Sequence, residues 1–187
     1  MDKESEIIKA IANGDKKVFP ILYERFSDKV YNTALSYTKN IEDAEEITQD
    51  VFIKIYKSAA TFKGNSTLNT WIYRIAINTS LNYLKKKNRF AFFKSSLTSS
   101  QSVDLEHPGV LLEQKENAAM LYKVIDCLPD NQKTAFILSF IEDLPRQEVA
   151  NIMEISLKAV ESLLQRAKKN MRSELEKLYP NRRKTKK

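Results

Sequence analysis

The chain has 187 residues, of which 42% are hydrophobic and 29% are charged, and its formal net charge is +7. This composition is typical of a globular protein with one domain or two small ones. No apolar run is long enough to span a bilayer, and the first residues lack a secretory signal pattern. We therefore expect no membrane insertion and a cytoplasmic location.

The chain is also poor in the residues that most active sites need. It contains one cysteine, one histidine and three glycines. These counts exclude an internal disulfide, a cysteine-based zinc site and a glycine-rich phosphate loop. We expect a protein that is not an enzyme and that uses no metal and no cofactor.

The charged residues are unevenly distributed along the chain. Residues 51–103 contain nine Lys or Arg residues and no Asp or Glu, whereas residues 42–50 contain five acids. A carboxylate near a phosphate backbone would repel it, so a long basic segment without acids favours contact with nucleic acid. The simpler alternative is a solvated basic face that has no partner.

The first half of the chain predicts helices, because apolar residues recur at spacings of three and four while Gly and Pro are scarce. We expect helices near residues 4–13, 15–39, 43–60 and 68–87, with a loop at residues 62–67. The third helix would bury one face, formed by Ala44, Ile47, Val51, Ile55 and Ala59. The fourth would bury Ile72, Ile75, Ala76 and Thr79.

The second half begins with a change of composition. Residues 93–112 are dominated by Ser, Gln, Pro and Gly, which predicts a flexible linker. Helices resume near residue 112 and are interrupted before Pro129 and before Pro145. We expect Cys127 to be a small core residue, and we assign no role to His107 in the linker.

These elements predict an all-α protein built from two small helical bundles joined by the linker. We expect the first bundle at residues 1–92 and the second at residues 113–180, followed by a basic tail at residues 181–187. Each bundle is small, so each hydrophobic core would be thin.

The second bundle contains a helix-turn-helix pattern at residues 146–164. Val149, Ile152 and Met153 would face inward from the first helix, and Val160, Leu163 and Leu164 would do so from the second. Ser156 is placed to cap the second helix. Glu154 stands in the turn, where a positive φ would cost on the order of 1 kcal/mol.

The outward side of that second helix carries groups that reach base edges or phosphates in a DNA major groove. A helical hairpin with an ordinary solvated surface is the alternative. The candidate DNA-binding residues are Lys158, Glu161, Ser162, Gln165, Arg166 and Lys169.

Two further surfaces are expected in the first bundle. The helix at residues 43–60 exposes Glu46, Gln49, Asp50 and Ile53, and an isoleucine among acids suits a protein interface better than nucleic acid. The alternative is a plain solvated face, and a metal site there would lack ligands from a second helix. The next helix has a polar stripe close to aromatic rings, an arrangement that holds unstacked bases. Its members are Thr70, Arg74, Asn78, Asn82, Lys85 and Arg89, and the alternative is that the nearby Trp71 and Tyr73 are core residues.

Two stretches together resemble the extracytoplasmic-function sigma factors of the sigma-70 family. Residues 43–89, which include DAEEITQDVF and TWIYRIA, resemble region 2 of that family. Residues 128–172, which begin LPDNQKTAF, resemble region 4. The two stretches occur in the family's order and separation, and they cover most of the chain.

The resemblance implies a bacterial transcription initiation factor that binds core RNA polymerase and promoter DNA, with an anti-sigma factor as a further partner. The exposed face formed by Glu46, Gln49, Asp50 and Ile53 would bind the clamp helices of the polymerase. The outward face of the second helix of the helix-turn-helix would read the minus-thirty-five element. Recognition and melting of the minus-ten element would fall to Gly64, Asn65, Ser66, Thr67, Trp71, Arg74, Asn78, Asn82 and Lys85.

Two other functions remain open from the residues alone. A stand-alone helix-turn-helix regulator would have a sensing domain at residues 1–92, although such a domain gives no reason to exclude acids from residues 51–103. A helical metal-dependent nuclease would need clustered carboxylates or histidines that the sequence does not offer.

Overall fold

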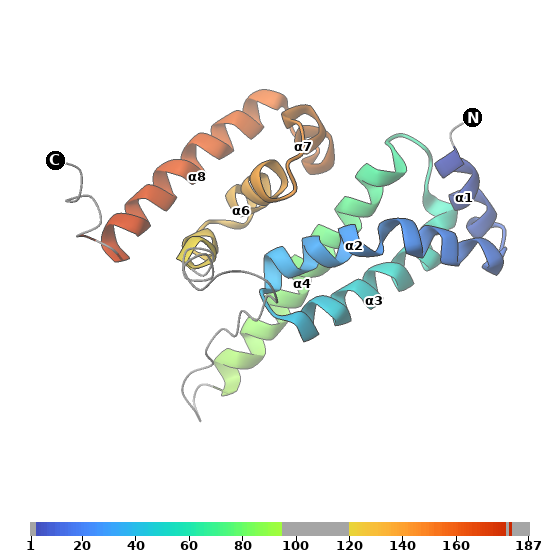
Figure 1. The fold of residues 1–187 in the computed structure, drawn as a ribbon, viewed down its shortest axis with the longest axis horizontal. Helices are drawn as coiled ribbons and strands as arrows, with labels where there is room; N and C mark the ends of the chain where they lie inside the picture. Colours follow the sequence, from blue (N-terminus) through green and yellow to red (C-terminus); the bar gives the residue numbers. More distant parts are fainter. Residues whose placement is uncertain (1–2, 95–119, 179, 181–187) are drawn as a thin grey trace. The chain divides into compact units, whose positions relative to one another are not determined.

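The computed structural model describes residues 3–94, 120–178 and 180, and these residues form helices and turns without a strand (Figure 1). They fall into two compact units on either side of residues 95–119. The first unit contains α1 (Lys3–Ala12), η1 (Lys16–Val18), α2 (Phe19–Thr38), α3 (Ile41–Ser58), η2 (Ala59–Thr61) and α4 (Leu68–Lys94). The second contains a helix at residues 120–126, α6 (Asp130–Phe136), the π-helical turn η3 (Ile137–Ile141), α7 (Arg146–Met153) and α8 (Leu157–Leu178). The all-α, two-bundle prediction is confirmed.

In the first unit, α2, α3 and α4 pack side by side, and α1 packs against η2. The inner face predicted for this helix is confirmed, because its four residues on α3 are fully buried and the fifth, Ala59 in η2, is 3% exposed. On α4, Ile72, Ala76 and Thr79 are buried as predicted, whereas Ile75 is only partly buried. Burial of these apolar side chains is the main force that holds the bundle together.

Local signals explain where the first helices begin and end. Asp15 caps η1 by accepting a hydrogen bond from the Lys17 N–H, and Pro20 lies in the first turn of α2, where its missing N–H has no cost. The predicted single helix at residues 15–39 is therefore divided. Asn40 starts α3, because its Oδ1 accepts from the Asp43 N–H at 2.8 Å.

The helix α4 is longer than predicted. Thr67 caps its first turn, and the helix continues past the expected end at Lys87 as far as Lys94, because neither Gly nor Pro follows to stop it. The remainder of the predicted linker, together with His107 and the basic tail, lies outside the described residues.

The second unit has its own core. Val124, Ile125, Ile137, Leu138, Val149 and Val160 are fully buried, and the helices break at Pro129 and Pro145 as predicted. Met153 and Leu163, expected to face inward, are only partly buried because they lie at the edge of the apolar stripe.

The expectation that Cys127 is a core residue is wrong. Its thiol is exposed and lies 3.4 Å from the Lys123 carbonyl oxygen. Val124 and Leu128, one helical turn apart, take the inward positions of this segment, and Cys127 falls beside them on the solvent side.

The two faces of α3 give a direct test of this packing. Ile47→Ala leaves a cavity beneath a fully buried side chain and should lower the free energy of unfolding by about 2–5 kcal/mol. Ile53→Ala, on the exposed face of the same helix, should change it by less than about 0.5 kcal/mol. Urea denaturation followed by circular dichroism measures both, and equal losses would contradict the assignment of the two faces.

Candidate functional site

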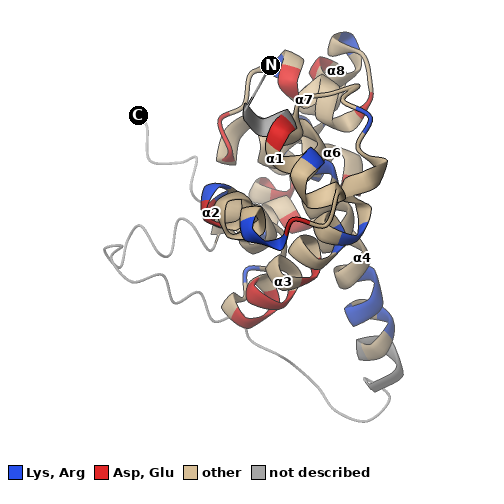
Figure 2. Cartoon of the chain, turned by 90° about the vertical axis from the view of Figure 1, so that its right-hand side faces the viewer, with Lys and Arg blue, Asp and Glu red and all other residues tan. Residues whose placement is uncertain are grey.

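The predicted protein-binding face of α3 is exposed as a continuous surface. Glu46, Gln49 and Asp50 are exposed, and Ile53 keeps 50% of its surface accessible. Their spacings of three, one and three residues place all four side chains on one side of the helix. Figure 2 shows Asp and Glu residues along α3 and Lys and Arg residues near the C-terminal end of α4. The structure therefore brings together all four residues that the sequence assigned to this face.

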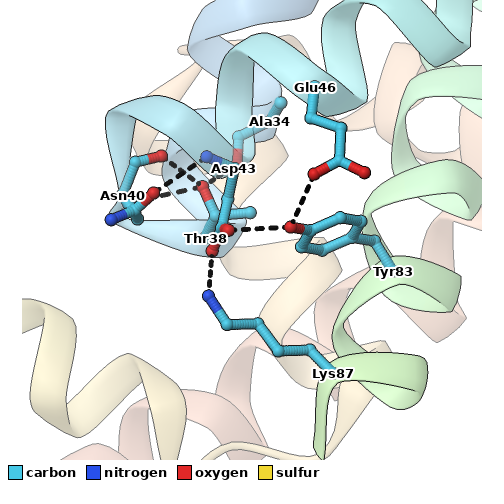
Figure 3. A network of polar contacts seen from close by, with 7 residues as sticks. All are labelled: Ala34, Thr38, Asn40, Asp43, Glu46, Tyr83 and Lys87. Atoms are coloured by element: carbon cyan, nitrogen blue, oxygen red, sulfur yellow. Dashed lines mark hydrogen bonds and ion pairs between the residues drawn. The ribbon is translucent and has the colours of Figure 1, made fainter. Parts of the chain in front are cut away.

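A polar network joins this face of α3 to α4 (Figure 3). The Tyr83 hydroxyl lies 2.8 Å from Asp43 Oδ1 and 3.0 Å from Glu46 Oε2, and Lys87 Nζ lies 2.5 Å from Asp43 Oδ2. Asp43 is a buried carboxylate, only 9% exposed, at the N-terminal end of α3, where the helix dipole favours a negative charge. The sequence pattern does not predict this group, because Tyr83 and Lys87 lie 40 and 44 residues from Asp43 along the chain.

The network determines the ionisation of Tyr83. Burial of the phenol, followed by its hydrogen bonds to Asp43 and Glu46, raises the pKa of Tyr83 well above its usual value near 10. The neutral hydroxyl is thus a permanent hydrogen-bond donor to these two carboxylates at physiological pH.

The predicted minus-ten loop lies between η2 and α4. Gly64 adopts a positive φ of 72°, which glycine tolerates without strain, and Gly64, Asn65 and Thr67 are exposed while Ser66 is half-buried. The Thr67 Oγ1 accepts a hydrogen bond from the Thr70 N–H at 3.1 Å, so this side chain, predicted as a DNA contact, caps α4.

The aromatic residues beside this loop divide into two groups. Trp71 is half-buried and packs on Phe62, with ring centroids 5.2 Å apart. Tyr73 and Thr70 are each 3% exposed and belong to the core, so the prediction that Thr70 lies in the exposed stripe is wrong. For Tyr73 the core alternative is confirmed.

The remaining predicted residues of α4 share one outward side. Asn78, Asn82 and Lys85 are exposed, and Arg74 is half-buried in line with them. With 3.6 residues per turn, these positions lie on the opposite side of α4 from Tyr83 and Lys87. One side of α4 therefore faces α3 and the other offers amide and basic groups to solvent.

The helix-turn-helix forms as predicted in the second unit. Glu154 ends α7 with a φ of 57°, and the Ser156 Oγ accepts from the Ala159 N–H at 3.2 Å to cap α8. Of the outward residues of α8, Ser162 is half-buried and the other five are exposed. Arg166 Nε donates to the Ser162 carbonyl oxygen at 3.3 Å, so its guanidinium lies along the helix.

Neither a membrane span nor a metal cluster was found in the part of the chain that the structure describes. No helix there has the length and hydropathy to cross a bilayer, and no group of three His, Cys, Asp or Glu side chains could hold a metal ion.

Family models match both units. The model for sigma-70 region 2 matches residues 22–90, and the model for sigma-70 region 4 matches residues 118–171. Together they cover more than half of the chain, and they fall on the two bundles that the fold separates.

The chain belongs to the sigma-70 family. It is a sigma factor of the extracytoplasmic-function type, a transcription initiation factor that directs RNA polymerase to promoters. Its helix-turn-helix lies within the region 4 match, and the region 2 match covers most of α2, all of α3 and most of α4.

Relatives along the whole length support this assignment. The sigma factor is 29% identical to the ECF RNA polymerase sigma-E factor of Haemophilus influenzae, over 94% of this chain and 96% of that one. It is 27% identical to the RNA polymerase sigma-H factor of Pseudomonas aeruginosa, over 89% and 91% of the two chains.

Solved structures show the same fold. CnrH in complex with the cytosolic domain of CnrY matches with a TM-score of 0.66 and 18% identity, covering 94% of this chain and 98% of that one. The sigma factor RpoE of Bartonella quintana, in complex with the anti-sigma factor NepR, matches with a TM-score of 0.64 and 20% identity, covering 86% and 98%.

The raised pKa of Tyr83 predicts a dependence of stability on pH. Tyr83→Phe removes the hydroxyl and should lower the free energy of unfolding by about 1 kcal/mol at neutral pH. The folded chain holds this proton more tightly than the unfolded chain, whose tyrosines titrate near pH 10. The stabilisation is therefore complete below about pH 10 and is lost as the pH rises toward the folded pKa. Urea denaturation of both proteins across this range should show their difference shrinking, and a constant difference would contradict the network.

Proposed function

We propose that the exposed face of α3 is the surface through which this sigma factor binds core RNA polymerase. Ile53 is a large apolar side chain held half-exposed on a rigid helix, next to the carboxylates of Glu46 and Asp50 and the amide of Gln49. An apolar anchor ringed by polar groups is the usual make-up of an interface hot spot. The acidic groups select a basic partner surface, which agrees with the clamp helices that the family resemblance implies.

We assign recognition of the minus-ten element to the loop at residues 64–67 and the outward side of α4. Opening a promoter requires a nontemplate base to leave the stack, at a cost of a few kcal/mol. Asn65 and Ser66 supply short polar groups, and the basic side of α4 follows the phosphates. Support comes from the absence of acids between residues 51 and 103, which leaves this surface free of repulsive carboxylates.

We assign recognition of the minus-thirty-five element to the outward side of α8. Gln165 and Arg166 are exposed about two turns into α8, where side chains reach base edges, and the exposed Lys158 and Lys169 lie on either side of them as the proposed phosphate contacts. Glu161 can accept a hydrogen bond from cytosine N4, which makes a cytosine in the element the natural partner of this position.

With these assignments the sigma factor only binds, and the polymerase to which it is bound performs the chemistry. We propose that the sigma factor has no enzymatic activity of its own, acts in the cytoplasm, and divides functionally into residues 1–92 and 113–180. An anti-sigma factor is the proposed inhibitory partner, supported by the two solved complexes of similar fold.

Variants of α3 test the polymerase contact. Asp50→Lys and the double variant Gln49→Ala/Ile53→Asp should each weaken binding to bacterial core polymerase at least tenfold. Asp50→Lys places a positive charge where the proposed interface has a negative one, and Ile53→Asp places a charge where it has an apolar anchor. Co-elution on gel filtration and a fluorescence titration measure the loss.

Glu6→Lys is the matched control, since Glu6 is an exposed acid on α1 and the charge change equals that of Asp50→Lys. It should bind as the wild type does. If Asp50→Lys and the double variant bind core polymerase as tightly as the wild type, the assignment of this face is contradicted.

A second pair of variants tests the DNA contact of α8. On DNA selected from a random pool by wild-type holoenzyme, Gln165→Ala should cost about 1–3 kcal/mol and relax the preference at one base position. Lys169→Ala should weaken binding evenly across sequences and reduce the salt slope by about one. Filter binding at several salt concentrations distinguishes the two, and an unchanged base preference in Gln165→Ala would contradict its assignment.

A further inference from the structure

Tyr83 and Lys87 join the two helices that carry the proposed surfaces of the first unit, from the side of α4 that faces α3. Both belong to α4, and both bind Asp43 near the start of α3 (Figure 3). Tyr83 also reaches Glu46, a member of the proposed polymerase-binding face. A single phenol therefore touches the polymerase surface while it sits on the helix that carries the DNA surface.

The C-terminal half of α4 has little apolar support. Buried side chains on this helix end at Ser80, and from residue 81 to residue 90, the last whose burial the structure describes, each side chain is half-buried or exposed. Figures 1 and 2 both show this end of α4 extending beyond the other helices of the unit. Asn82 and Lys85, two of the proposed minus-ten contacts, lie in this stretch, where the ring of Tyr83 packs against the edge of the core and its hydroxyl, with Lys87, adds polar contacts to α3.

The hydrogen bonds of Tyr83 and Lys87 are well suited to hold this stretch. Asp43 has a side chain that is only 12% exposed, and its two carboxylate oxygens bind the phenol and the ammonium at 2.8 and 2.5 Å. Charge-assisted bonds to a shielded carboxylate are stronger than bonds in open solvent. Asp43 itself is fixed at the first turn of α3 by the cap from Asn40.

We propose that Tyr83 and Lys87 are positioning residues that hold the C-terminal half of α4 on Asp43 and so couple the polymerase-binding face of α3 to the minus-ten surface of α4. The proposal rests on the function assigned above to these two surfaces. Neither side chain touches DNA; each acts through the placement of Asn82 and Lys85.

The coupling follows from the single proton of the phenol. Asp43 and Glu46 share this donor, at 2.8 and 3.0 Å. A basic group of the polymerase that binds Glu46 takes that carboxylate away from Tyr83 and leaves the proton entirely to Asp43. The hold on α4 then tightens, and by reciprocity a fixed α4 favours the arrangement of Glu46 that the polymerase binds.

The same contacts give Lys87 a role unlike that of its neighbours. Residues 85–87 are three consecutive lysines in the basic segment, and any of them would ordinarily be taken for a phosphate contact. Lys87 is neutralised by Asp43, whereas Lys86 is exposed and Lys85 lies on the outward side. Lys87 should therefore contribute nothing to the salt dependence of DNA binding.

The experiment compares Tyr83→Phe and Lys87→Met with Lys85→Met and with the control Lys86→Met, which removes the same charge from an exposed position. Core polymerase affinity is measured by fluorescence titration. Holoenzyme affinity is then measured on a fork-junction DNA that carries the single-stranded minus-ten segment selected by the wild type, at several salt concentrations. Circular dichroism melting identifies any variant that does not fold, and in that case the other positioning variant carries the test.

Tyr83→Phe and Lys87→Met should each weaken holoenzyme binding to this DNA about fivefold to tenfold, while core affinity changes less than twofold. Lys87→Met should keep the salt slope of the wild type, and Lys85→Met should reduce it by about one. Lys86→Met should bind core polymerase as the wild type does.

Three results would overturn the proposal. Lys87→Met could reduce the salt slope by one, which would make Lys87 a phosphate contact. Both positioning variants could bind DNA as the wild type does. They could also lose affinity for core polymerase and for DNA by the same factor, together with a lower melting temperature, which would make the network purely structural. If the wild type itself does not bind core polymerase, the assigned function fails, and this result is distinct because it appears before any DNA is added.

Discussion

The separation of α3 into one buried and one exposed face is the constraint on which the first unit depends. Its inner residues are almost completely buried between α2 and α4, which fixes the rotation of the helix about its own axis. Once that rotation is fixed, Glu46, Asp50 and Ile53 must face outward, whatever their own preferences. The same rotation directs Asp43, at the first turn, toward α4. The exposed face of α3 and the contacts of Asp43 with α4 are thus two consequences of one packing arrangement.

Stability and function use different contacts in this small unit. Fully buried side chains on α4 end at Ser80, and beyond it the helix is held by the ring of Tyr83 at the edge of the core and by polar contacts to α3. Such contacts are directional, so they fix an orientation more sharply than apolar packing does, at a modest gain in free energy. This division suits the proposed minus-ten role of α4, because polar contacts on the α3 side leave Asn78, Asn82 and Lys85 exposed on the other side.

In the second unit, backbone geometry fixes the orientation of the helix α8. The turn of the helix-turn-helix places Glu154 in the left-handed region, where a residue with a side chain is strained, and Ser156 then caps the recognition helix. The strain is offset by the burial of Val149, Ile152, Val160 and Leu164 across the joint. The turn thereby fixes the angle at which α8 presents its outward side.

The sequence alone determined the helices, their inner stripes, the two bundles and the exposed faces of α3 and α8, because the period of a helix places each residue on a known side of its own element. It also carried the family, through motifs that lie within single helices. Only the tertiary structure decided which side chains meet across helices: that Tyr83 and Lys87 bind Asp43, that Tyr73 belongs to the core, and that Cys127 is exposed. Those contacts depend on the relative rotation and register of packed helices, and a local pattern in one helix contains no information about the register of its neighbour.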